Sequence, residues 1–150
     1  MNPSTAGSQM EDPYRLKRFV DAQNLTGTYE TAVSELRTGR KVGHWMWFIF
    51  PQVTGLGHSY MSREFGISSV AEARAYLLHP VLGPRLMECA QILMRVEGKS
   101  AAEILGAIDA MKLRSSMTLF LTAEPGEPLF SEVLAKYFHG SADQETIARL

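Results

Sequence analysis

The fold class is decided by one short run of apolar residues, Trp45-Met46-Trp47-Phe48-Ile49-Phe50, which is followed by Pro51. Six bulky residues in a row fit a buried strand or a buried helix equally well, so periodicity alone does not separate the two. No other stretch of the chain alternates cleanly between apolar and polar residues, so no partner strand is visible. We therefore predict a short helix that ends at Pro51, because proline disfavours a helical conformation in the residue before it.

The rest of the chain carries the apolar spacing of amphipathic helices, in which residues recur at i, i+3, i+4 and i+7. The clearest predicted helix covers residues 84–97, and its inward stripe is Leu86, Cys89, Ala90, Leu93 and Val96. Capping residues mark the predicted boundaries: Asp12 before Pro13, Ser69 with Glu72, Ser100 with Glu103, Asp109, and the C-terminal stops Gly39 and Gly140. The sequence thus predicts an all-α protein, a compact bundle of about seven to nine helices, several of them short.

Length and composition indicate one ordinary globular domain. The 150 residues suit a single helical domain over residues 12–150, with residues 1–11 as a disordered leader or an expression remnant. The net charge of −1 argues against general nucleic-acid binding. The longest apolar run has six residues, whereas a membrane span needs roughly 20. Cys89 is the single cysteine and cannot form an internal disulfide, so we expect a cytoplasmic protein.

Three blocks of the chain resemble a known family. They are Arg40-Lys41-x-x-His44-Trp45-Met46-Trp47-Phe48-x-Phe50-Pro51-Gln52-x-x-Gly55-Leu56-Gly57, Tyr76-Leu77 with Leu82-Gly83-x-Arg85-Leu86, and Lys112-Leu113-x-Ser115-Ser116-Met117-Thr118-Leu119-Phe120. On these residues the chain is similar, from about residue 12 to residue 150, to the family catalogued as domain of unknown function 1810. The resemblance implies a small, wholly helical protein of bacterial type, and it leaves the biochemical role to be argued from the residues.

The first candidate site is the indole-rich segment, which holds both tryptophans of the chain. Its ligand-binding candidates are Arg40, Lys41, His44, Trp45, Trp47 and Gln52. Indole faces can stack on a ligand ring, which contributes roughly 1–3 kcal/mol per stacked base, and the two cations can hold phosphates. In the alternative interpretation the aromatic side chains belong to the core. For His44, a structural role and a ligand contact have equal weight.

The second candidate site lies on a predicted helix over residues 110–121, whose inward stripe is Leu113, Met117 and Phe120. Its ligand-binding candidates are Lys112, Arg114, Ser115 and Ser116. Two cations and two hydroxyls near the first turns of a helix suit an anion, because the helix N-terminus adds free N–H groups and positive potential. The alternative is a solvated basic face whose serines bond to the carbonyls at i−4. We expect the two sites to converge on one pocket.

These features predict a protein that binds a small anionic, ring-containing, nucleotide-like ligand near His44–Gln52. The alternatives are a hydrolase of N-glycosidic bonds in ADP-ribose-like substrates, and a protein-interaction module, with a monomer or a homodimer expected. The candidate catalytic residues are Glu35, His44 and Asp109. The histidines lack ligand spacing and no cofactor motif is present, so neither a metal nor a cofactor is expected. The loop Gly55–Ser59 is predicted to be a turn with positive φ.

Overall fold

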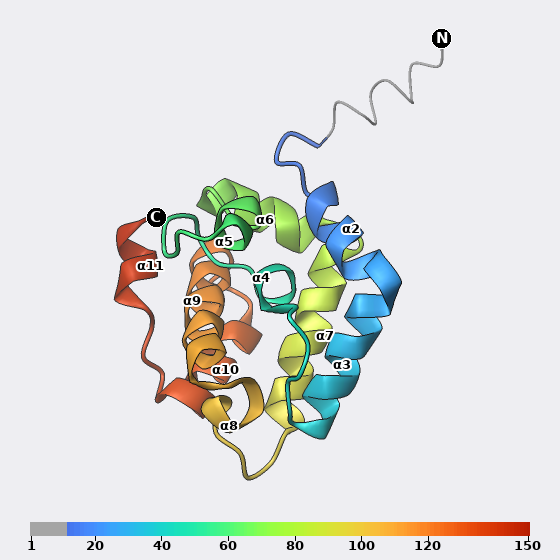
Figure 1. Ribbon diagram of the computed structural model, residues 1–150. Coiled ribbons are helices and arrows are strands. Elements are labelled where there is room, and N and C mark those ends of the chain that lie inside the picture. Colours follow the sequence, from blue (N-terminus) through green and yellow to red (C-terminus); the bar gives the residue numbers. More distant parts are fainter. Residues whose placement is uncertain (1–11) are drawn as a thin grey trace.

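The computed structural model describes residues 12–150, so the predicted leader over residues 1–11 lies outside the described residues. The described chain is all-α, as predicted, and none of its helices is long and apolar enough to cross a membrane. The elements in chain order (Figure 1) are α2 (Lys17–Asn24), η1 (Leu25–Gly27), α3 (Thr28–Thr38), α4 (Met46–Ile49), α5 (Tyr60–Glu64), α6 (Val70–Leu78), α7 (Leu82–Arg95), α8 (Ala101–Leu105), α9 (Ala107–Ala123), α10 (Pro128–Phe138) and α11 (Gln144–Ala148).

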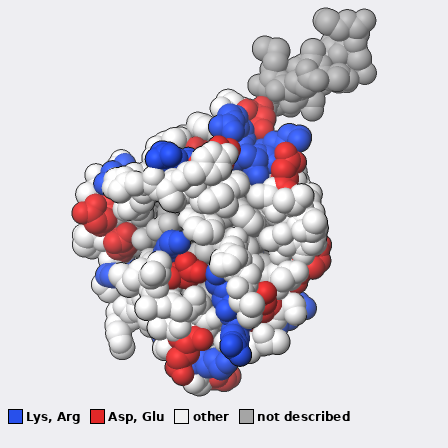
Figure 2. All heavy atoms as spheres, in the orientation of Figure 1, with Lys and Arg blue, Asp and Glu red and all other residues white. Residues whose placement is uncertain are grey.

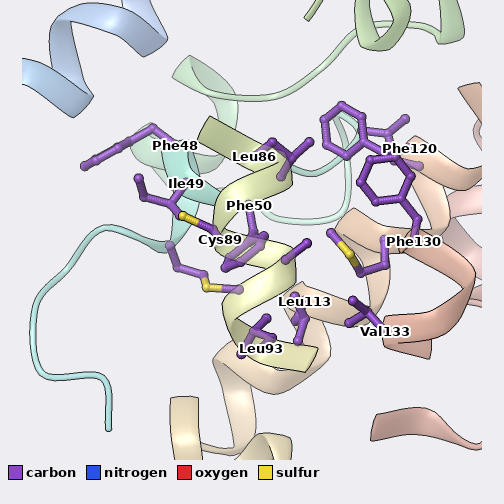
Figure 3. Close-up of a cluster of buried hydrophobic side chains, with 14 of the residues drawn as sticks. Phe48, Ile49, Phe50, Leu86, Cys89, Leu93, Leu113, Phe120, Phe130 and Val133 are labelled. Carbon is purple, nitrogen blue, oxygen red and sulfur yellow. The ribbon is translucent and has the colours of Figure 1, made fainter. Parts of the chain in front are cut away.

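Helix α9 is the centre of the packing, because α6, α8, α10 and α11 all contact it. The predicted inward stripe is confirmed, since Leu113, Met117 and Phe120 are fully buried. Side chains from α4, α7, α9 and α10 gather in one apolar cluster (Figure 3). Burying each large apolar side chain contributes about 1.5–3 kcal/mol, so this cluster holds the helices that carry the site in place.

Within the apolar run that decides the fold class, Met46–Ile49 form α4, a single helical turn with Phe50 as its C-cap residue, so the predicted short helix before Pro51 is confirmed. Trp47 is half-buried, whereas the other five side chains of the run are buried. Beyond α4 the chain makes an isolated parallel bridge between Val53 and Ile67. The sequence did not indicate this bridge, which holds the connection after α4 against the segment that follows α5.

Two of the predicted helix starts are wrong. Helix α2 begins at Lys17 rather than Pro13, because the chain first makes a turn. Across that turn the carboxylate of Asp12 accepts hydrogen bonds from the backbone N–H groups at the helix start. Helix α9 begins at Ala107, before Asp109, and the Asp109 carboxylate forms ion pairs with two lysines instead of capping the helix.

Of the two predicted capping boxes, only Ser100 with Glu103 is complete. Ser69 accepts the expected hydrogen bond from the Glu72 N–H group at 3.1 Å. The Glu72 carboxylate, however, is buried and pairs with the Arg18 guanidinium at 3.0 Å. Arg18 also donates to two backbone carbonyls at the end of α5. This carboxylate therefore joins α2 to the start of α6 rather than closing a helix cap.

Candidate functional site: a cleft beside Trp47

A cleft of about 440 Å³ lies between the connection from α4 to α5, the first turns of α9, and α11. Its volume falls within the range of roughly 300–1,000 Å³ that is typical of small-molecule pockets. In the view of Figure 1, α9 lies between α4 and α11. In the view of Figure 2 the surface is mostly uncharged, with acidic and basic groups interleaved rather than gathered by sign.

The two indoles of the chain have different surroundings. Trp47 is half-buried and lines the cleft, where the Lys112 ammonium lies 4.4 Å from the centroid of its ring. Trp45 is buried in the core, and its Nε1–H group donates a hydrogen bond to Glu35 at 2.9 Å. Gln52, three residues beyond α4, also lines the cleft. One indole thus serves packing, and the other faces the space that a ligand can enter.

Glu35, at the end of α3, organises the segment that leads into α4. Its Oε1 atom accepts three hydrogen bonds, from the N–H groups of Val42 (2.7 Å) and Gly43 (2.9 Å) and from the Trp45 indole (2.9 Å). Burial by itself raises the pKa of Glu35, but these hydrogen bonds together outweigh it and lower the pKa below its ordinary 4.5. The carboxylate does not line the cleft, so its evident role is to position the segment.

On α9, Lys112 and Ser115 line the cleft one helical turn apart. The Asp109 carboxylate bridges two lysines, with Lys112 at 3.3 Å and Lys41 at 2.9 Å. Lys41 is largely buried and also donates to the Gly43 carbonyl, so its charge is used within the fold. Among the described residues, Lys112 is the lysine or arginine that lines the cleft.

The third wall is residues 141–150, which we call the C-terminal strap. The hydroxyl of Ser115 donates to Asp143 Oδ2 at 2.8 Å, and the hydroxyl of Thr146 donates to the same oxygen at 2.6 Å. Burial raises the pKa of Asp143, but the hydrogen bonds from Thr146 and Ser115 lower it below its ordinary value. Arg114 donates further hydrogen bonds to the start of the strap. Polar contacts from α9 therefore hold this wall in place.

The connection between α4 and α5 completes the lining. Gly55 has a φ of +93°, as predicted, and a Cβ there would lie 2.5 Å from the guanidinium of Arg149 on the strap. This close approach brings the connection and the strap together at one edge of the cleft. His58, Ser59 and Ser62 line the cleft, and Ser59 caps α5 by accepting the Ser62 N–H group at 3.1 Å.

The predicted ligand-binding residues divide between the cleft and its surroundings. Both predicted clusters contribute to the lining, through Trp47, Gln52, Lys112 and Ser115. The other candidates lie outside it: Arg40, Lys41, His44, Trp45, Arg114 and Ser116. His44 is exposed, while Ser116 is buried and its Oγ has no hydrogen-bond partner within the described residues. The catalytic candidates Glu35, His44 and Asp109 do not line the cleft either.

Sequence reasoning missed several lining residues, above all His58, Ser59, Asp143 and Glu145. The glycine-rich loop was a signal for the first two, but it predicted only a turn. Asp143 lies 28 residues from Ser115, and no local pattern indicated that α9 would hold it. Within residues 12–150, no group of three or more His, Cys, Asp or Glu side chains is placed to hold a metal ion.

Comparisons with known proteins agree with the fold. The family described as "Protein of unknown function (DUF1810)" matches residues 13–150. The crystal structure of the conserved hypothetical protein Rv1873 from Mycobacterium tuberculosis is similar, with 52% sequence identity and a TM-score of 0.89. The match covers 93% of this chain and 98% of that one. A search of curated proteins gives no match. The chain therefore belongs to the DUF1810 family.

Proposed function

We propose that the protein binds a small ring-containing ligand of nucleotide type in the cleft beside Trp47. The observation that carries the proposal is the half-buried indole, with the Lys112 ammonium 4.4 Å from its ring centroid, in a cleft of about 440 Å³. A base stacked on an indole contributes roughly 1–3 kcal/mol, against about 0.5–1 kcal/mol for an exposed cation–π contact. A base can therefore displace the ammonium from the indole face, and an anionic group of the ligand can then share this ammonium with Asp109, which lies 3.3 Å from it.

The proposal involves fewer cations than the sequence suggested. Arg40, Lys41 and Arg114 lie outside the cleft, and Lys41 and Arg114 bind other parts of the fold. Lys112 is then the cation for a single anionic group, and the hydroxyls and the Gln52 amide of the lining supply neutral hydrogen bonds. A ligand with one ring and one phosphate fits this inventory better than a densely charged one.

Intrinsic fluorescence and thermal shift with the four ribonucleoside monophosphates test the proposal. We expect ligand to change the indole emission and to raise the melting temperature. Trp47→Ala should weaken binding about tenfold or more, and Lys112→Met should weaken binding of the nucleotides but not of the free nucleosides.

Matched controls are Tyr60→Ala, an exposed aromatic outside the lining, and Lys17→Met, whose ammonium pairs with Asp21 on α2. Both should bind as the wild type does. If no nucleotide changes the emission or the melting temperature of the wild type, the proposal is overturned.

Two other functions compete with this one. A glycosidic hydrolase gains no support from the geometry, because Glu35 and Asp109 both lie outside the cleft and accept hydrogen bonds or ion pairs within the fold. Incubation with ADP-ribose-like substrates, followed by mass spectrometry, tests it directly.

A protein-interaction module is favoured by the apolar rim, where Ile108 is 75% and Met111 is 54% exposed. Light scattering separates an interaction module from ligand binding, because a protein that only binds a ligand in a pocket is expected to be a monomer.

We also propose a cytoplasmic setting. Cys89 is the only cysteine of the chain, and it is free and buried. A protein without disulfide bonds suits a reducing compartment.

A further inference from the structure

Carboxylates face the cleft from the C-terminal strap, and the proposed base-binding contacts do not use them. Asp143 and Glu145 both line the cleft. Two hydroxyls, from Ser115 and Thr146, bond to Asp143 Oδ2, which leaves accepting capacity because an ionised carboxylate offers about four acceptor sites. Glu145 is exposed and lies 3.8 Å from the Arg149 guanidinium, a loose contact. Both side chains can therefore accept hydrogen bonds from a ligand.

The spacing along α9 limits the size of that ligand. Lys112 contacts the Trp47 ring and Ser115 contacts Asp143, so α9 links the aromatic and the acidic parts of the cleft. Residues three apart on a helix have Cβ atoms about 5–6 Å from each other. The α9 residues that contact the ring-binding surface and Asp143 are thus about one helical turn apart, a spacing that suits a base joined directly to a sugar.

The charges of the lining limit the number of phosphates. Lys112 is balanced by Asp109 at 3.3 Å, and Asp143 and Glu145 add negative charge on the strap. One phosphate can reach Lys112, but further phosphates meet carboxylates at close range, where like charges repel.

We infer that Asp143 and Glu145 accept hydrogen bonds from the ribose hydroxyls of the ligand, so that the cleft selects ribonucleoside monophosphates over deoxyribonucleotides and triphosphates. Acidic side chains are the usual acceptors for ribose hydroxyls in nucleotide-binding folds, because a carboxylate can bond to the diol while neutral groups hold the base. This inference rests on the proposed function. It specifies in addition which sugar the ligand carries and how many phosphates.

Calorimetric titration at fixed ionic strength tests the inference with the four ribonucleoside monophosphates, their 2′-deoxy counterparts and the triphosphates. We expect the best ribonucleotide to bind about tenfold tighter than its deoxy counterpart, because a hydrogen bond to a charged group is lost. The corresponding triphosphate should also bind more weakly than the monophosphate.

Glu145→Gln is the informative variant, since Glu145 is exposed and its replacement leaves the Ser115–Asp143 contact in place. It should reduce the preference for ribose and improve triphosphate binding, whereas the exposed control Glu132→Gln on α10 should change neither. Equal binding of ribo- and deoxyribonucleotides, or tighter binding of triphosphates, overturns the inference and leaves the proposed function standing. Failure of every nucleotide to bind overturns both.

Discussion

Among single side chains, Glu35 offers the clearest test, because one of its oxygens accepts three hydrogen bonds. Glu35→Gln keeps an acceptor oxygen but removes the charge, and hydrogen bonds to charged groups are worth about 1.5–3 kcal/mol against about 0.5–1.5 kcal/mol for neutral ones. We expect urea unfolding at neutral pH to show a loss of about 1–2 kcal/mol, after allowance for solvent screening. The control Glu132→Gln should stay within about 0.5 kcal/mol, and equal losses in the two variants would contradict the assignment.

The pKa of Glu35 also predicts how this loss depends on pH. Because the folded pKa lies below the ordinary 4.5, the charged carboxylate stabilises the fold fully above that value. Its contribution is lost as the pH falls through the folded pKa. The stability gap between wild type and Glu35→Gln should therefore be constant near neutrality and close at acidic pH. Urea titrations at several pH values measure this difference in the free energy of unfolding. Asp143 titrates in both proteins, so its effect cancels in the difference. A gap that widens in acid would refute the account.

Among the helices, α11 depends on polar contacts more than on apolar burial. Thr146 is its one buried residue, and Ser115 on α9 donates to Asp143 at its start. Ser115→Ala removes a hydrogen bond worth about 1 kcal/mol, so amide hydrogen exchange in α11 should become about fivefold faster. The urea midpoint should change little, because the core of α9 is untouched. Ser131→Ala on the exposed face of α10 is the matched control, and equal acceleration by both variants would refute the role of Ser115.

The same contrast explains which elements the sequence could predict. The inward stripe of α9 follows from helical spacing alone, because Leu113, Met117 and Phe120 recur at i, i+4 and i+7 and all three are buried. The wall formed by α11 depends on the contact between Ser115 and Asp143, 28 residues apart, which no local pattern encodes. Likewise Glu72 matches a capping box in the sequence, but the Arg18 guanidinium competes successfully for its carboxylate. Long-range polar partners, rather than periodicity, account for these errors.

The residues of the candidate site also differ in whether the sequence could predict their role. Trp47 stands out in the sequence because the chain has two tryptophans, Lys112 stands out by its place beside two serines, and both residues line the cleft. Trp45 carries the same signal but is buried, because a one-turn helix directs neighbouring side chains to different sides. Which indole faces the cleft is decided by the whole packing, including the Glu35 carboxylate that holds the other indole. A sequence pattern therefore locates the segment but not the side chain that is available to a ligand.

For the fold as a unit, the ion pair between Arg18 and Glu72 ties α2 to α6. The two side chains are 11% and 3% exposed and their charged atoms are 3.0 Å apart. Removing one partner of such a pair leaves an uncompensated buried charge, which costs about 3–5 kcal/mol. We expect Arg18→Met and Glu72→Gln each to lower the free energy of urea unfolding by this amount. The exposed pair of Lys17 and Asp21 is the control, and Lys17→Met should cost less than about 1 kcal/mol.

A double-mutant cycle separates the ion pair from the other contacts of Arg18 and Glu72. In Arg18→Met/Glu72→Gln neither charge is left, and the side-chain oxygen of the introduced glutamine can still accept from the neighbouring Ser68, as the carboxylate of Glu72 does. The double variant should therefore lose at least about 1 kcal/mol less than the sum of the two single losses, as expected for residues in direct contact. Additive losses would mean that the backbone hydrogen bonds of Arg18, and not its charge, join α2 to the rest of the fold.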